Sequence, residues 1–556
     1  MSWIFEILSQ LPYTVFQLLS RLLCDHSFNR NEKQPWKEIE DEAEHLHELP
    51  SWNVPDNSLM FQAFEWHVPD DQAHWRRLRR ALPTLEAMGF DNIWIPPGCK
   101  AANPSGNGYD IYDLYDLGEF DQKGSQPTKW GTKEELQSLV SRAQDFGIGI
   151  YWDAVLNHKA GADYSERFSA VRVDPQNRNI EISPAEDIES WVGFSFPGRD
   201  AQYSSLDYHW YHFTGVDWDE LRREKAIFKT TGPDKEWAPD VSDENGNYDY
   251  LMFSNVDYPN AEVREDVLQW GSWITTQLPL SGMRLDAVKH YSAKFQRVFI
   301  DKLRESQGEE FFIVGEYWKA EIDVLLDYLE RMEYRLSMFD VPLLANFSSV
   351  SHTEGADMRR IFHRTLVQQR PEHAVTFVAN HDTQPGQSLE APIAPFFKPL
   401  AYALILLREK GQPCVFYGDI YGIATDKTYT PESSCAGKLS TLTQARKLYA
   451  NGGQRDYFDE ANCIGFVRYG NFLHPVGLAC IMSNAGPARK RMYVGQTNAG
   501  EQWTDILEGR EENVTINSKG YGTFPVAEYS VSVWVNYSAE GRESLHHFLN
   551  EDIYQH

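Results

Sequence analysis

Residues 281 to 290 read SGMRLDAVKH, a short apolar run typical of a buried strand that ends in ionisable side chains. Burying a charged side chain costs free energy unless the charge is paired. Such a cluster at a strand end therefore needs either a partner or a function. The side chains in question are Arg284, Asp286, Lys289 and His290.

Other apolar runs of strand length repeat this pattern along the chain, at 59–66, 90–96, 147–155, 311–316, 335–341, 374–382 and 413–419. Amphipathic segments of helical length lie between most of them, including 75–89, 132–147, 264–278, 292–306 and 358–370. Strands that alternate with helices pair in parallel through right-handed crossovers. Eight such units predict an α/β fold of the closed (β/α)8 TIM-barrel type.

Two regions depart from the alternation. Residues 159–259 are irregular and rich in Asp, Asn, Gly and aromatic residues, which predicts an inserted, irregular β-rich domain after the third strand. Short alternating runs after residue 450 predict a C-terminal antiparallel β-sandwich domain. The expected division is an N-terminal extension and acidic linker (1–50), the barrel (51–158 and 260–450), the inserted domain (159–259), the C-terminal domain (451–537) and a polar tail (538–556).

Composition narrows the class of partner. The 556 residues carry a formal net charge of -29, whereas nucleic-acid binding depends on clustered Lys and Arg. We therefore expect a neutral or cationic small substrate and no nucleic acid. The six scattered cysteines show no C-x-x-C motif and predict reduced thiols.

The first 25 residues are apolar but carry no basic residue before Arg21 and are interrupted by Glu6, Gln10 and Pro12. This pattern predicts neither a signal peptide nor a membrane span. An amphipathic helix packed on the protein is favoured over one that touches a membrane surface. A cytoplasmic location follows as an expectation, and the oligomeric state is not predicted.

The carboxyl ends of barrel strands carry the chemistry of this fold class. This chain places there four acids from four different strands, together with three histidines, an arginine and a lysine. Each acid alone would be read as a solvated loop carboxylate or a salt bridge, but jointly they indicate one site. The residues are Asp153, Asn157 and His158; Arg284, Asp286, Lys289 and His290; Glu316; and His381 and Asp382.

Paired carboxylates suit glycosidic bond cleavage, which needs one protonated and one ionised group. Arg284 lies on the same strand face as Asp286 and is expected to lower its pKa. Glu316 follows an apolar run and precedes two aromatic residues, so burial is expected to raise its pKa. Asp286 is therefore predicted to be the nucleophile and Glu316 the acid.

The segments DAVLNH (153–158), GMRLDAVKH (282–290), VGEYW (314–318) and VANHDTQPGQ (378–387) resemble the four ordered signature regions of alpha-amylases in glycoside hydrolase family 13. LMFSNVD (251–257) resembles the fifth region of that family. The resemblance runs from about residue 59 to residue 536 and is closest to the liquefying bacterial and cytoplasmic branch.

The resemblance implies roles for individual residues. Asp286 would form a covalent glycosyl-enzyme, Glu316 would be the acid/base, and Asp382 would be a third carboxylate that binds sugar hydroxyls. The cleaved sugar would be bound by Tyr109, His158, Arg284 and His381, and the leaving group by Lys289, His290 and Trp318. Retention of anomeric configuration is expected.

The resemblance also implies a structural Ca²⁺ held by Asn157, Asp249, Asn255 and the backbone carbonyl of His290, all oxygen donors. Asn255 stands where the branch usually has an aspartate, so a weakened site is expected. Thr214, Ala238 and Pro259 occupy positions where secreted relatives supply acids for a further metal cluster, so no cluster is expected. The alternative is that Asp249 only makes a turn hydrogen bond.

The function implied is an endo-acting retaining hydrolase of alpha-1,4-glucosidic bonds in starch, glycogen or malto-oligosaccharides. A 4-alpha-glucanotransferase that acts on malto-oligosaccharides is the first alternative, because a sugar hydroxyl can also resolve the covalent intermediate. A noncatalytic glucan-binding protein is the second, and the presence of all three acids argues against it.

Overall fold

The computed structural model describes residues 57–424, 435, 437–545 and 553–554. Several predicted features lie outside these residues: the N-terminal extension with its acidic linker, the N-terminal helix, Cys24, and residues 546–552 and 555–556 of the polar tail. None of the helices in the described part of the chain combines the length and the apolarity needed to cross a bilayer.

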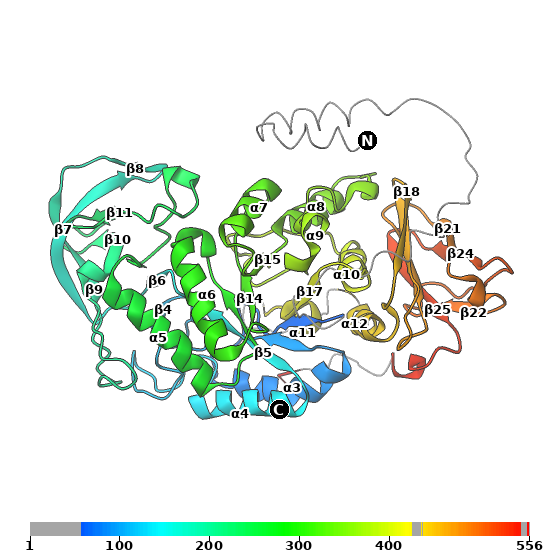
Figure 1. Cartoon of the computed structure of the whole chain (residues 1–556), viewed down its shortest axis with the longest axis horizontal. Coiled ribbons are helices and arrows are strands. Elements are labelled where there is room, and N and C mark those ends of the chain that lie inside the picture. The colour runs from blue at the N-terminus through cyan, green and yellow to red at the C-terminus, as the bar shows by residue number, and fades with distance from the viewer. Residues whose placement is uncertain (1–56, 425–434, 436, 546–552, 555–556) are drawn as a thin grey trace, which may run out of the picture. The chain divides into compact units, whose positions relative to one another are not determined.

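Eight parallel strands close into a barrel in the order β1-β17-β16-β15-β14-β13-β5-β2. Figure 1 shows the barrel between the inserted sheet on the left and the C-terminal β domain on the right. Each strand overlaps one of the eight apolar runs, and β17 alone begins one residue before its run, so the predicted TIM barrel is confirmed. The strands are β1 (Met60–Gln62), β2 (Asn92–Trp94), β5 (Gly149–Ala154), β13 (Gly282–Leu285), β14 (Phe312–Gly315), β15 (Ser337–Phe339), β16 (Ala374–Phe377) and β17 (Gln412–Phe416).

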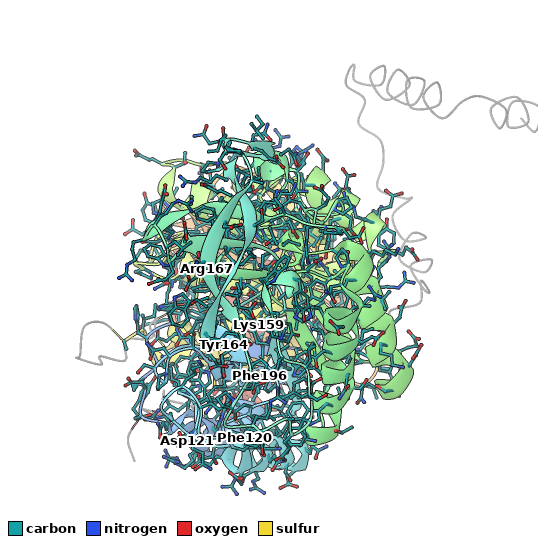
Figure 2. The ribbon with its side chains drawn as sticks, turned by 90° about the vertical axis from the view of Figure 1, so that its left-hand side faces the viewer. Phe120, Asp121, Lys159, Tyr164, Arg167 and Phe196 are labelled. Atoms are coloured by element: carbon teal, nitrogen blue, oxygen red, sulfur yellow. The ribbon has the colours of Figure 1, made fainter. Side chains whose placement is uncertain are left out.

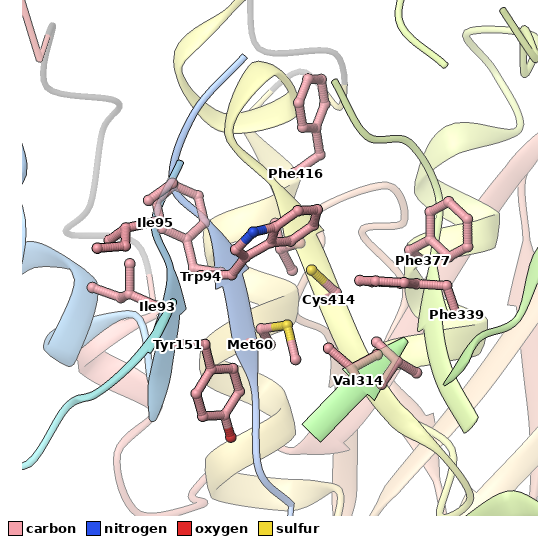
Figure 3. Packing of buried hydrophobic residues seen from close by; sticks show 14 of the residues in the cluster. Met60, Ile93, Trp94, Ile95, Tyr151, Val314, Phe339, Phe377, Cys414 and Phe416 are labelled. Carbon is pink, nitrogen blue, oxygen red and sulfur yellow. The ribbon is translucent and has the colours of Figure 1, made fainter. Parts of the chain in front are cut away.

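Large apolar side chains fill the barrel interior, so the barrel is a packed core and not a pore (Figure 3). The Trp94 and Phe339 rings lie 5.5 Å apart, and Phe339 packs edge-on against Phe377 at 5.6 Å. Met60 and Cys414 lie opposite each other on β1 and β17. This packing holds the strand ends, and therefore the residues that follow them, in fixed positions.

Helices cover the barrel: α3 (His74–Ala87), α4 (Lys133–Asp145), α5 (Ala261–Gln277), α6 (Ala293–Gln307), α7 (Ile322–Arg331), α8 (Val341–His352), α10 (Lys398–Leu406), α11 (Tyr417–Tyr421) and α12 (Lys438–Tyr449). Four of the five predicted helical segments are confirmed. Helix α4 begins with a capping box, in which Thr132 and Glu135 satisfy each other's backbone N–H groups. Ser292 caps α6 through the N–H of Phe295 at 3.2 Å.

The predicted helix over 358–370 is wrong. This segment forms a 3-10 turn (Met358–Arg360) and the short helix α9 (Leu366–Gln369). Between them Arg364 adopts a left-handed conformation with φ of 57°, which a continuous helix does not allow. The buried carboxylate of Asp340 accepts the N–H groups of Leu366 and Val367, a tertiary interaction that the helical pattern does not reveal.

An antiparallel sheet forms the framework of the insertion after β5, so the predicted β-rich inserted domain is confirmed (Figure 2). Its strands are β6 (His158–Lys159), β7 (Tyr164–Asp174), β8 (Asn177–Glu181), β9 (Glu186–Gly193), β10 (Phe213–Asp219), β11 (Glu224–Thr230) and β12 (Ser254–Val256). Strand β12 pairs with β6, which places Asn255 opposite His158. The two ends of the insertion are thus joined beside the barrel mouth. A two-stranded ladder of β3 (Lys100–Ala101) and β4 (Ile111–Asp113) precedes it.

The C-terminal antiparallel β domain is also confirmed. One sheet has the order β18-β19-β20-β25-β22-β23, and a second pairs β21 with β24. The strands are β18 (Gln454–Glu460), β19 (Cys463–Arg468), β20 (Leu478–Ser483), β21 (Ala488–Tyr493), β22 (Gln502–Asp505), β23 (Val514–Thr515), β24 (Tyr521–Val526) and β25 (Ser530–Asn536). Cys99, Cys414, Cys463 and Cys480 are buried thiols outside any disulfide.

Candidate active site

The barrel register brings the predicted acids to one edge. Asp286 and Glu316 each continue the parallel ladder by one backbone hydrogen bond beyond the strand end, from Asp286 N–H to the Ala154 carbonyl and from Glu316 N–H to the Leu285 carbonyl, both at 3.0 Å. Ala287 then turns the chain with a left-handed φ of 49°. Both carboxyl groups therefore project from adjacent strands at the same level.

Arg284 connects three of the acids. Its Nη1 lies 2.6 Å from Asp153 Oδ1 and 2.8 Å from Asp286 Oδ1, and its Nη2 lies 2.8 Å from Glu316 Oε2. The arginine side chain is fully buried, at 0% exposure. One guanidinium therefore holds both candidate catalytic carboxyls, and it lies beneath them and does not line the cavity.

The balance of effects on Asp286 differs from the sequence-based expectation. Burial raises the pKa of Asp286 well above its usual range; Arg284 opposes this shift, while Glu316, Asp153 and Asp382 add to it. Arg284 lowers the pKa of Asp286 as expected, but burial outweighs this effect, so the net shift is upward. The physical reason is that one cation is shared among several buried carboxylates, so its charge does not offset their desolvation and mutual repulsion.

Three nearly parallel rings form one wall of the site. Tyr109 and His381 lie 5.0 Å apart with an angle of 5° between their planes, and Trp66 is within 9° of the Tyr109 plane at 5.9 Å. The Tyr109 hydroxyl donates to Asp153 Oδ2 at 2.8 Å, which fixes the ring. Flat aromatic faces of this kind suit contact with a sugar ring.

The histidines of the site are neutral at neutral pH. Burial, followed by the charge of Arg284, lowers the pKa of His381 to about 3, and burial lowers that of His158 to about 4. His158 Nε2 lies 2.8 Å from the Tyr109 carbonyl, and His381 Nδ1 lies 3.0 Å from Gln62 Nε2. These imidazoles can hydrogen-bond a neutral ligand but add no positive charge.

A cavity of about 750 Å³ lies over the carboxyls, within the range of ligand sites. The structure brings most of the predicted site residues to its wall: Tyr109, His158, Asp286, Lys289, His290, Glu316, Trp318, His381 and Asp382. Lys289 Nζ donates to Glu244 Oε2 at 2.9 Å and to the Trp318 carbonyl at 3.2 Å. These contacts link the inserted segment to the loop after β14.

The prediction missed several lining residues: Trp66, Met252, Phe253, Gln387, Ser388 and Leu389. Trp66 follows β1 as His381 follows β16, so its place after a barrel strand was the available signal. Met252 and Phe253 are 37% and 38% exposed and come from the inserted segment. Both lie in LMFSNVD (251–257), the segment that resembles the fifth family region, and that resemblance was the available signal, whereas their position at the cavity depends on how the insertion folds back.

Comparison with known proteins agrees with this geometry. A model of the alpha-amylase catalytic domain matches residues 62–473. The chain belongs to the alpha-amylase family. It is a glycoside hydrolase of alpha-1,4-glucosidic bonds in starch-type substrates.

Curated alpha-amylase relatives cover most of the chain. An alpha-amylase of Bacillus licheniformis is 47% identical over 481 residues, which are 86% of this chain and 93% of the relative. A cytoplasmic alpha-amylase of Escherichia coli is 40% identical over 489 residues, 86% of this chain and 99% of the relative. The solved structure of an alpha-amylase from Geobacillus thermoleovorans complexed with acarbose has a TM-score of 0.57 at 16% identity, covering 86% of this chain and 97% of that one. The last likeness shows the fold alone.

Three of the four residues predicted to bind calcium in this amylase, Asn157, Asn255 and Asp249, are joined with Thr214 in one buried network. Asn157 Nδ2 donates to Asn255 Oδ1 at 3.2 Å, Asn255 Nδ2 to Thr214 Oγ1 at 2.8 Å, and Thr214 Oγ1 to Asp249 Oδ2 at 3.0 Å. Within the described part of the chain, the His290 ring makes no bond to this network; its Nδ1 lies 2.9 Å from the carbonyl of Tyr248, the residue before Asp249. The alternative, that Asp249 only makes a turn hydrogen bond, does not describe all of its contacts, because its carboxylate also accepts a hydrogen bond from Thr214 in this network.

Two features of the network fit an oxygen-seeking cation. Asn157 Oδ1 is buried and has no hydrogen-bond partner among the described residues. Burial raises the pKa of Asp249 to about 7, and no ion pair to a lysine or arginine compensates its charge in the part of the chain that the structure describes. A buried carboxylate beside an unpartnered amide oxygen is a donor set that suits Ca²⁺.

Proposed function

We propose that this amylase is an endo-acting retaining hydrolase in which Asp286 is the nucleophile, Glu316 the acid/base and Asp382 a third carboxylate that binds sugar hydroxyls. The observation that carries the proposal is the single guanidinium shared by Asp286 and Glu316 at 2.8 Å each. Two carboxyls on one guanidinium favour the close spacing, about 5 Å, of retaining enzymes over the wider spacing of inverting ones.

The donors around Glu316 support its role as the acid. Its Oε2 accepts from Arg284 Nη2 at 2.8 Å and from the N–H of Ala287 at 3.3 Å. Because these donors occupy Oε2, the other oxygen, Oε1, is the one that can carry a proton to the leaving group. The proton passes from Oε1 to the glycosidic oxygen as the bond to the anomeric carbon breaks.

The two carboxyls support each other's protonation states. The negative charge of Glu316 is one of the causes that raise the pKa of Asp286. Protonating Glu316 removes this repulsion, so a protonated acid lowers the pKa of the nucleophile beside it. The state with a proton on Glu316 and a charge on Asp286 is the one that glycoside cleavage needs.

The remaining lining residues fall into two groups, one for each side of the bond that is cleaved. Tyr109, His158 and His381 would contact the sugar that forms the covalent intermediate, with Tyr109 presenting its ring. Lys289, His290 and Trp318 would contact the leaving-group side. Arg284 would act through the carboxyls, since it is fully buried beneath them. Lining residues on both sides of the acids support cleavage within a chain.

The test is product analysis with maltoheptaose, with Asp286→Asn as the inactive control. Shorter products that first appear as the α-anomer are expected. Products longer than maltoheptaose would identify the activity as that of a glucanotransferase. Products that first appear as the β-anomer would refute the covalent intermediate. Turnover by Asp286→Asn equal to that of the parent protein would refute the nucleophile assignment. No turnover by the parent protein would favour a binding protein.

We also propose one Ca²⁺ site formed by Asn157, Asp249, Asn255 and the backbone carbonyl of His290. When bound, the ion would supply the positive charge that the buried Asp249 lacks and would tie the inserted domain to the barrel. With one carboxylate in the set, affinity is expected to be lower than in a site with two. Calcium should raise the Tm of the chelated protein, and no such rise in Asp249→Asn is expected. An equal rise in both proteins would refute the site.

A cytoplasmic site of action is proposed from the Escherichia coli relative, whose printed name is cytoplasmic alpha-amylase. The buried thiols Cys99, Cys414, Cys463 and Cys480 are compatible with a reducing compartment. Cell fractionation tests this: the protein should accompany cytosolic markers, and its recovery with secreted proteins would refute the proposal.

A further inference from the structure

A second cavity, of about 520 Å³, lies away from the carboxyl cluster and shares no lining residue with the active-site cavity. It is bounded by the outer side of β16, by α9, by the end of α10 and by β18 of the C-terminal domain. The lining residues are Arg359, Arg360, Phe362, His363, Val367, Gln368, Thr376, Leu404, Ile405, Arg408, Lys410, Asp456 and Phe458. Its size is within the range of small-molecule sites.

The charge of this wall is opposite to that of the whole chain. Four of its side chains are cationic and one is a carboxylate, whereas the chain carries a net charge of -29. Two of the cations are neutralised internally, Arg359 by Asp357 and Arg408 by Asp456. Arg360 and Lys410 form no ion pair with any carboxylate that the structure describes.

Arg408 is held rigidly at the cavity wall. Its guanidinium forms two parallel hydrogen bonds to Asp456, at 2.6 and 3.0 Å, and lies 4.5 and 5.2 Å from the ring centroids of Phe362 and Phe458. A cation clamped in this way keeps its position without a ligand, so a ligand pays little additional ordering entropy. The rings also give the cavity an apolar side.

Thr376 is an independent sign of a ligand. It is 1% exposed, lines the cavity, and its Oγ1 has no hydrogen-bond partner among the described residues. Since Val375 and Phe377 flank it on β16, alternation directs its side chain away from the barrel core. A buried hydroxyl without a partner costs free energy that a bound acceptor would remove.

We propose that this cavity binds a small organic phosphate, a phosphate monoester of a sugar. A phosphate monoester carries a charge of about -1.5 to -2 at pH 7, which matches the two unneutralised cations. Arg360 would present its planar fork of donors to the phosphate oxygens, and Lys410 would add a point charge. The apolar floor of Val367, Leu404 and Ile405, together with the Thr376 hydroxyl, would take the sugar portion.

Calorimetric titration of the full chain with glucose 6-phosphate tests the proposal, with inorganic phosphate and maltose as comparison ligands. Saturable binding of the phosphate ester is expected. The double variant Arg360→Gln, Lys410→Gln should weaken it by at least about tenfold, because each charge-assisted hydrogen bond contributes that much. Thr376→Val, which keeps the shape and removes the hydroxyl, should also weaken it.

Lys302→Gln is the matched control, since Lys302 is an exposed cation on α6 far along the chain from the cavity residues. It should bind the ester as the parent does, and all variants should keep their activity on maltoheptaose. No saturable binding of glucose 6-phosphate would overturn the proposal. Equal weakening in Lys302→Gln, or maltose binding with the same dependence on Arg360 and Lys410, would overturn the phosphate assignment. Saturable binding of inorganic phosphate alone would overturn the sugar portion.

Discussion

Arg284→Gln removes the guanidinium that Asp153, Asp286 and Glu316 share. At 2.8 Å and an effective dielectric constant of about 20, each of the contacts to Asp286 and Glu316 amounts to about 6 kcal/mol before desolvation is subtracted. An opposite charge at this range lowers a carboxyl pKa by about 1–3 units. Losing it should therefore raise the pKa of Asp286 further and reduce kcat/KM near neutral pH by about 10- to 1000-fold.

The assay is the pH profile of kcat/KM on maltoheptaose. Because a nucleophile with a raised pKa is ionised only at higher pH, the acidic limb of the Arg284→Gln profile should move to higher pH, with about tenfold recovery per pH unit. Arg284→Lys keeps the positive charge but loses the planar guanidinium that contacts several carboxylates, so the acidic limb of its pH profile should lie between those of the parent and Arg284→Gln. Arg142→Gln, at an exposed arginine on α4, should match the parent.

Stability must be measured in parallel. Leaving buried carboxylates without their cation should lower the free energy of unfolding by about 3–5 kcal/mol. Near-UV circular dichroism below the Tm should still match that of the parent. A folded Arg284→Gln variant with activity within tenfold of the parent at neutral pH would refute the reasoning. So would a loss of the same size at every pH, because it would show that Arg284 only positions the carboxyls.

Four further perturbations test other parts of the structure. Tyr109→Phe keeps the ring and loses the two hydrogen bonds of the hydroxyl, one donated to Asp153 and one accepted from Arg284. Because the ring remains, steady-state kinetics should show less than about a tenfold loss in kcat/KM, whereas Tyr109→Ala should lose about 100-fold. Asn255→Asp adds a second carboxylate to the proposed calcium set, and calcium titration should give a lower Kd; an unchanged Kd would remove Asn255 from the set. Lys235→Met leaves Asp257, 4% exposed, without its ammonium partner, so denaturant titration should show a loss of about 3–5 kcal/mol, against little change in Lys302→Met. Burial raises the pKa of Asp340 to about 6, so the folded state holds this proton more tightly than the unfolded chain does. The contribution of this group to the free energy of unfolding should therefore fall by about 3 kcal/mol as pH rises from about 4 to about 6. Asp340→Asn should lack that fall.

The barrel was predictable because its signal is local. Eight buried strands between amphipathic helices leave a periodic pattern, and the closed barrel has the strand order that parallel crossovers impose. The segment 358–370 shows where local pattern fails. Its helical periodicity is overridden by Asp340, which takes the N–H groups of Leu366 and Val367 from another part of the chain.

The candidate site was partly predictable for the same reason. Asp286, Glu316 and Asp382 follow barrel strands, and that position alone predicts a shared edge. The insertion residues Met252 and Phe253 carry no such positional signal, and the cationic cavity beside β16 combines segments whose sequence separation hides them. Such sites depend on which surfaces the fold brings together.

Sequence by itself determined the strand and helix order, the identity of the acids at the barrel mouth and the family to which those motifs belong. Only the tertiary structure decided how one buried guanidinium is divided among Asp153, Asp286 and Glu316. The physical reason is that a pKa depends on burial and on every charge within a few ångströms, whatever the sequence separation. Residue spacing along a strand reports only one of those neighbours.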